Sequence, residues 1–232
     1  MPRSRHPALW IMFFMIAAFC WLLNFEVANF HLAGMVDSAE ACLMACLALA
    51  LATRSWKALP LLGAIGGLAK ETLAPLAFLF AFGWVWREPR KPWLALAALG
   101  AAGLTVVVLL RSVIEGRLVT PLQMAGDELA IDGASGLLRA AVGPFTAWVT
   151  WLTFLWMLPF AWRGMGRLPR EALRATAFAL AGAFALVVWH DAGSNGARPF
   201  FNVAGPCLCL AFAIGVAEAG EPGDGRPRTA RG

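Results

Sequence analysis

Apolar runs, each about as long as a membrane is thick, alternate with short polar segments along most of the chain. A helix that spans a bilayer needs about 20 apolar residues. Eight runs have this character, although the third and fourth are short: 8–25, 35–53, 58–69, 73–86, 93–110, 142–162, 172–189 and 200–217. The pattern therefore predicts an all-α fold, a polytopic transmembrane helix bundle with about eight spans.

The composition agrees with this interpretation. Of the 232 residues, 60% are hydrophobic and only 14% are charged, whereas a soluble domain has about 25% charged residues. Polar side chains are too few to cover so much apolar surface in water. The net charge of +5 comes from small basic groups between apolar runs, a placement typical of membrane proteins. We therefore expect a lipid bilayer as partner and no nucleic acid.

The basic residues also predict the orientation. If the N-terminus is inside and successive segments alternate, 14 of the 19 Lys and Arg residues fall on the inner side, as the positive-inside rule requires. Both termini are then cytoplasmic. Residues 1–218 form the helical domain, and the Gly-, Pro- and Arg-rich residues 219–232 are expected to be a disordered cytoplasmic tail. In the long outer connection, Thr120 and Pro121 have the character of a helix start.

The cysteines give no sign of a metal site. All five lie inside apolar runs, and no His accompanies Cys42 and Cys46 at their i, i+4 spacing. Zinc needs about four suitably spaced ligands. We expect reduced thiols that pack between helices, with no metal and no cofactor.

The sharpest polar feature is Lys70-Glu71-Thr72, between two short apolar runs of about 12 and 14 residues. At about 1.5 Å per residue, helices of this length are shorter than the hydrocarbon core of about 30 Å. Lys70 and Glu71 would then lie in a recess below the outer surface, with Thr72 capping the next helix. Charged groups at such depth are candidates for function. The alternative is a neutral Lys70–Glu71 pair in an ordinary tight turn.

Two further outer segments carry candidate polar groups. The loop 190–199 contains Asp191 and Arg198, and Arg198 could bind a phosphate or pair with Asp191; a plain connecting loop is the alternative. Asp37 lies at the start of the second run, where it could simply cap the helix.

These segments resemble a known family. Asp37 opens an apolar helix, a basic turn follows at Arg54, and Gly67-Leu68-Ala69-Lys70-Glu71-Thr72 begins the next helix. This order looks like the middle of bacterial polyprenyl-phosphate-dependent membrane glycosyltransferases of the GT-C class. Arg198-Pro199-Phe200 followed by Gly205-Pro206 is similar to their last outer loop and helix. The resemblance covers about half of the chain.

The resemblance implies sugar transfer from a lipid-linked phosphate donor on the outer, periplasmic face of the bacterial inner membrane. Lys70, Thr72 and Arg198 are the expected substrate-binding residues, since a cation near the phosphate stabilises the leaving group. Asp37, Glu71 and Asp191 are candidates for the acid that accepts the acceptor's proton.

The chain departs from the family in one respect. The large outer loop that carries the family's catalytic acid has no counterpart here, so no catalytic base can be carried over. A shortened member, a wrongly started gene product and a non-catalytic relative are the three open interpretations. A small-molecule transporter and a membrane scaffold or assembly protein without chemistry are the alternatives. A transporter needs polar groups near the midplane and often shows repeats, whereas here the polar groups gather at the outer side.

Overall fold

The computed structural model describes residues 36–88, 92–120, 123, 156–189 and 198–220, and within them the fold is helical, with no strand. The all-α prediction is therefore confirmed. The helices are α2 (Val36–Ala52), the 3-10 turn η1 (Trp56–Ala58), α3 (Leu59–Ala69), α4 (Leu73–Val85), α5 (Trp93–Glu115), α9 (Leu158–Met165), α10 (Arg170–Trp189) and α11 (Arg198–Gly220).

Most of these helices match the predicted apolar runs within a few residues. The clearest difference is α5, which continues to Glu115 and so passes the predicted end at 110 by more than a turn. It stops where Gly116 adopts a left-handed conformation with φ of 65°, a common helix terminator. The first run, most of the sixth run and residues 221–232 of the predicted tail lie outside the described residues.

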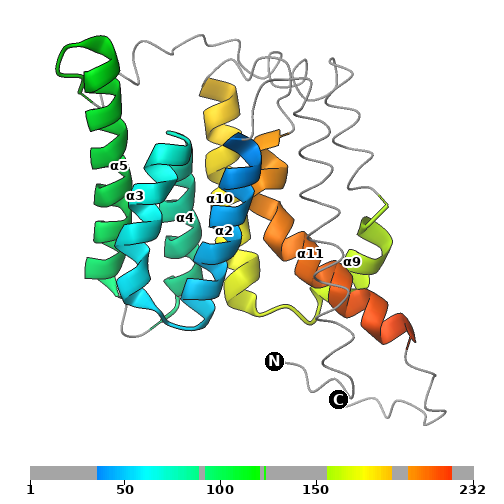
Figure 1. The fold of residues 1–232 in the computed structure, drawn as a ribbon. Helices are drawn as coiled ribbons and strands as arrows, with labels where there is room; N and C mark the ends of the chain where they lie inside the picture. Colours follow the sequence, from blue (N-terminus) through cyan, green and yellow to red (C-terminus); the bar gives the residue numbers. More distant parts are fainter. Residues whose placement is uncertain (1–35, 89–91, 121–122, 124–155, 190–197, 221–232) are drawn as a thin grey trace.

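The helices run up and down through the bundle (Figure 1). α2 and α4 run in one direction, and α3 and α5 in the other. α10 lies antiparallel to α4, because a Cβ on Gly83 would meet Ala175 while one on Gly182 would meet Leu79. α9 and α11 pack together as a second antiparallel pair. The bundle thus has two ends, which differ in their charged residues.

Close approach of backbones holds the bundle together. Gly63 and Gly67 of α3 lie against the backbone of Leu99 and Gly103 of α5, and an added Cβ on Gly67 would lie 2.5 Å from the Gly103 carbonyl oxygen. Small residues permit this packing between apolar helices. Around it lies one core with side chains from α2, α3, α4, α5 and α10, which includes Met44, Leu47, Leu51, Leu59, Leu73, Leu76, Phe80, Leu96 and Leu99.

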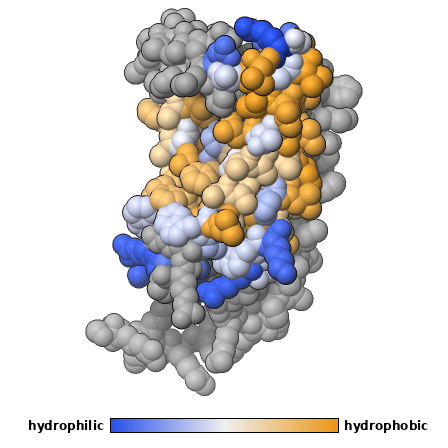
Figure 2. Space-filling view, turned by 90° about the vertical axis from the view of Figure 1, so that its left-hand side faces the viewer, coloured by the Kyte–Doolittle hydropathy of each residue, from blue (hydrophilic) through white to orange (hydrophobic). Residues whose placement is uncertain are grey.

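Large apolar side chains also lie on the surface of the bundle, above all on α5. Leu94, Val113 and Ile114 of α5 are each more than 70% exposed. Figure 2 shows an apolar band on the face of the molecule formed by α5 and its neighbours, with hydrophilic residues above and below it. Within the described residues, α5 is the one helix that is long and apolar enough to cross a membrane by itself, and the other apolar helices are shorter. The eight predicted spans therefore stay a prediction.

The described cysteines are free thiols, as expected. Cys209 is buried between helices, whereas Cys42 and Cys46 lie exposed on α2. The expectation that Cys42 and Cys46 pack between helices is wrong for the described part of the bundle, because their shared face of α2 points outward.

Candidate functional site

A buried ion pair joins α2 to the end of α3. The Lys70 Nζ donates a hydrogen bond of 2.9 Å to Glu40 Oε2. The Glu40 side chain is 1% exposed, whereas that of Lys70 is 27% exposed. Desolvating a carboxylate costs several kcal/mol unless a partner compensates for the lost water. Lys70 is therefore the counterion that allows Glu40 to sit inside the bundle.

A second ion pair joins the start of α4 to α5. The Arg111 Nε and Nη2 donate hydrogen bonds of 3.0 and 2.8 Å to the two carboxylate oxygens of Glu71. Both side chains are 36% exposed. A two-bond fork of this kind fixes the orientation of the guanidinium plane. Lys70 and Glu71, neighbours in sequence, thus attach the α3–α4 turn to two different helices.

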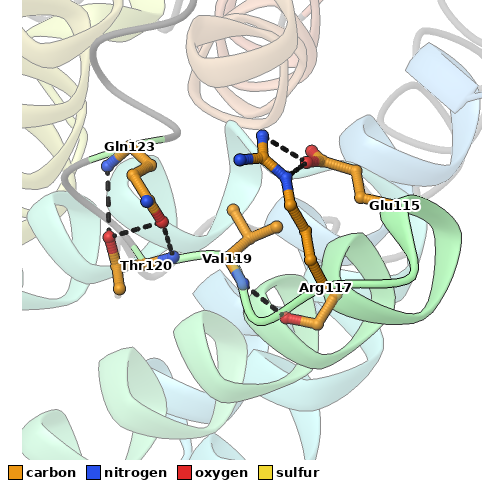
Figure 3. Close-up of polar contacts among 6 residues, drawn as sticks. Glu115, Arg117, Val119, Thr120 and Gln123 are labelled. Carbon is orange, nitrogen blue, oxygen red and sulfur yellow. Dashed lines mark hydrogen bonds and ion pairs between the residues drawn. The ribbon is translucent and has the colours of Figure 1, made fainter.

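We call the end of the bundle that holds Glu40, Lys70, Glu71 and Arg111 the paired-charge end. The segment after α5 folds back at this same end (Figure 3). Arg117 pairs with Glu115 at 2.9 Å, and the Val119 amide donates to the Ser112 hydroxyl at 3.0 Å.

Thr120 and Gln123 form the reciprocal bonds of a capping box. The Gln123 amide donates to Thr120 Oγ1 at 3.3 Å, and the Thr120 amide donates to Gln123 Oε1 at 2.9 Å. The predicted N-cap role of Thr120 is confirmed by these contacts. Pro121 lies outside the described residues.

The α3–α4 turn lies lower in the bundle than the end of α5. Gly67 and Gly103 lie side by side; beyond them α3 continues to Ala69 and α5 to Glu115. Ten more residues make α5 extend about 15 Å further, at 1.5 Å per residue. Figure 1 shows α5 rising above α3 and α4. The charged turn therefore lies below the end of α5, while its predicted position below the outer surface of a membrane stays a prediction.

The local structure of the turn corrects two sequence interpretations. The neutral Lys70–Glu71 pair is wrong, because Lys70 binds Glu40 and Glu71 binds Arg111. Thr72 occupies the N-cap position of α4, but its side chain makes no capping hydrogen bond, so the predicted cap is wrong as well. Its backbone has helical angles, φ −68° and ψ −19°, instead of the extended angles that a capping Thr adopts. Thr72 lies half-buried beside Glu71.

The other predicted site residues are only partly described. α2 begins at Val36, so Asp37 lies in its first turn, and α11 begins at Arg198. The side chains of both residues, and all of Asp191, lie outside the described residues. Figure 1 shows the starts of α2 and α11 at the same end of the bundle as the α3–α4 turn. Proximity of Lys70 to Arg198 stays a prediction.

Sequence reasoning missed the partners Glu40 and Arg111. Neither residue was among the predicted site residues. The available signal was their position: each is a charge within or at the edge of a long apolar run, and such charges usually face a partner inside the bundle.

Among the described residues, no three His, Cys, Asp or Glu side chains lie close enough together to hold a metal ion. Comparison with protein families, curated proteins and solved structures found no match for this chain.

Proposed function

We propose that the chain is a multi-pass membrane protein with about eight spans, related to polyprenyl-phosphate-dependent glycosyltransferases, in which Lys70 and Arg111 contact the phosphate of a lipid-linked sugar donor. The family resemblance of the Lys70-Glu71-Thr72 segment supports the relationship. The exposed apolar band of α5 supports the membrane location, because lipid solvates such a surface better than water does. The inner membrane of a bacterium is the proposed compartment.

The observation that carries the donor site is the recessed Glu40–Lys70 pair. Lys70 is anchored through one hydrogen bond to a buried carboxylate while 27% of its side chain is exposed. Arg111 is held in a similar way by Glu71 and remains 36% exposed. Glu40 and Glu71 thus hold Lys70 and Arg111 in fixed orientations at the α3–α4 turn. Two fixed cations of this kind are suited to binding a phosphate that approaches from the outer side. Arg198, at the start of α11, is the third cation of the proposed site, in which its side chain is directed toward Lys70 and Arg111.

The proposed chemistry assigns different tasks to the charged groups. Lys70 and Arg111 stabilise the negative charge that develops on the lipid phosphate as the bond from the sugar carbon to the phosphate oxygen breaks. Glu40 and Glu71 keep the two cations in place. Because both oxygens of Glu71 are engaged by Arg111, Asp37 and Asp191 are the better candidates for accepting the acceptor's proton.

A membrane scaffold is the second candidate function. The observation that favours it is that the two cations and two carboxylates balance each other, so the cluster can stabilise the bundle without any ligand. The two proposals differ in what replacing Arg111 should do: only a donor site loses affinity for lipid phosphate.

The test measures binding of a polyprenyl phosphate to purified protein in nanodiscs, with the corresponding polyprenol as the control ligand. Wild-type protein should bind the phosphate at least tenfold more tightly than the polyprenol. The double variant Glu71→Gln/Arg111→Gln removes the guanidinium without leaving a carboxylate unpaired, and it should lose this preference. Arg54→Gln, at the opposite end, is the matched control and should retain it.

A thermal unfolding measurement on each variant establishes that it is folded. If folded wild-type protein binds phosphate and alcohol equally, or if the folded double variant keeps the preference, the donor site is wrong and the scaffold function stands.

A further inference from the structure

Two thiols that the packing of the bundle does not use lie next to each other on α2. Cys42 and Cys46 are both exposed, and residues four apart lie on one face of a helix. We propose that Cys42 and Cys46 together bind one soft divalent metal ion of the mercuric type, held in a line between the two sulfurs. The inference uses none of the residues of the proposed donor site.

The helix fixes the distance between the two side chains. Cβ atoms four residues apart in a helix are about 5–6 Å from each other, whereas a disulfide needs a Cβ–Cβ distance of about 3.5–4.5 Å. The pair therefore cannot close on itself while α2 stays helical. The thiol groups of Cys42 and Cys46 are nevertheless close enough to hydrogen-bond to each other. One ion with two metal–sulfur bonds of about 2.3 Å, the length of a Zn–S bond, bridges sulfurs about 4.6 Å apart.

The surroundings of the pair favour an ion that needs only two ligands. In the part of the chain that the structure describes, no group of three His, Cys, Asp or Glu side chains could hold a metal ion. Leu49, the next residue on the same face of α2, is 64% exposed and offers no ligand atom. Zinc takes about four ligands, and thiolates favour soft ions over hard ones. Mercuric ion is a soft ion that two thiolates satisfy in a linear arrangement.

Charge balance favours a divalent ion over a monovalent one. Cys42 and Cys46 lie in the middle of α2, which in the proposed membrane location is the level of the hydrocarbon core, where net charge is costly. Two thiolates and a divalent ion form an uncharged complex, whereas the same thiolates with Cu(I) keep one negative charge. Reaction with mercuric chloride breaks two S–H bonds, forms two Hg–S bonds and releases two protons and two chloride ions, with no change of oxidation state.

The experiment measures the mercury that the full chain in nanodiscs retains. The protein is incubated with mercuric chloride and an excess of glutathione, desalted and analysed for mercury. Wild-type protein should retain one ion per chain, because two thiols on one helix present a higher effective concentration than separate glutathione molecules. Cys42→Ser and Cys46→Ser should each bind at least about 100-fold more weakly. Wild-type affinity in either single variant would overturn the inference.

Two control variants separate a thiol pair from a mere count of thiols. Cys207→Ser/Cys209→Ser removes two thiols from α11 and should retain the wild-type affinity. Cys46→Ser/Leu49→Cys keeps the number of thiols but separates them by seven residues, about 10 Å along the helix, so it should bind as weakly as Cys46→Ser. An equal loss in the α11 variant, or restored affinity in the Leu49→Cys variant, would overturn the inference. Thermal unfolding establishes that each variant is folded.

Further arms test the choice of ion and the membrane location separately. Under the same competition with glutathione, Zn(II) and Cu(I) should occupy less than about a tenth of the protein, and full occupancy by either would overturn the assignment of a mercuric-type ion. Carbonate extraction of cell membranes tests the location. Protein that stays in the membrane but retains no mercury refutes the thiol site alone. Protein released by carbonate refutes the membrane location and, with it, the argument from charge balance.

Discussion

The two ends of the bundle differ in how far their ion pairs are buried. At the paired-charge end, Glu40 meets Lys70 at 2.9 Å with the Glu40 side chain 1% exposed, and Glu71 meets Arg111 at 2.8 Å with both side chains 36% exposed. At the other end, Arg54 approaches Glu88 at 3.8 Å with 74% of its side chain exposed. Arg163, Arg167 and Arg170 are further exposed arginines at this end. The first end thus holds an ion pair with a buried carboxylate, whereas Arg54–Glu88 at the second end is a long and exposed contact.

Ion pairs at the two ends should therefore contribute differently to the free energy of unfolding. An ion pair in a poorly solvated site is strong only while both partners are present, since removal of one leaves a buried charge. An exposed pair contributes about 0–1 kcal/mol because water and salt screen it. Stability should therefore depend on the charges of the paired-charge end and hardly on those of the opposite end.

The largest effect is expected from Lys70→Met. It should lower the free energy of unfolding by about 3–5 kcal/mol, because Glu40, with a side chain 1% exposed, loses its counterion. Glu40→Leu should cost less, since the partly exposed Lys70 can turn toward solvent. The double variant Glu40→Leu/Lys70→Met should be more stable than Lys70→Met alone. Reversible unfolding in mixed detergent micelles measures all three.

Arg54→Met is the matched control for this series. It breaks the 3.8 Å contact with Glu88 and should change the free energy of unfolding by less than about 1 kcal/mol. An Arg54→Met effect as large as that of Lys70→Met would contradict the distinction between the two ends.

A smaller effect is expected from glycine replacements. Gly67→Val should destabilise by about 1–3 kcal/mol, because its Cβ would lie 2.5 Å from the Gly103 carbonyl oxygen and force α3 away from α5. Gly166 lies beside the exposed arginines with no atom within 4 Å of an added Cβ. Gly166→Ala should stay within about 0.5 kcal/mol of wild type. Thermal unfolding measures the stability of both variants. Equal losses of stability in Gly67→Val and Gly166→Ala would contradict the difference in packing at the two glycines.

Much of the fold could be predicted from the sequence because long apolar runs leave few alternatives to helices. The runs 73–86 and 172–189 correspond closely to α4 and α10. The end of α5 lies beyond the predicted residue 110, because a charged residue such as Arg111 ends an apolar run without ending the helix. In the structure Arg111 remains helical and turns its charge toward Glu71.

The candidate site could be located from the sequence but its contacts could not. Two short runs around Lys70-Glu71 indicated a recessed turn, and α3 and α4 do end below α5. Which carboxylate meets Lys70 depends on how helices 30 residues apart in the chain pack. No local pattern encodes the packing of α2 against the end of α3.

Reporter fusions test the central claim, that the two ends lie on opposite sides of a membrane. One fusion follows Arg167 in the turn between α9 and α10, and another follows Arg117 beside the paired-charge end. A reporter active only in the cytoplasm should be active after Arg167 and inactive after Arg117, and a reporter active only outside should give the reverse. Cytoplasmic activity at both positions, or an outside signal at Arg167, would contradict the account.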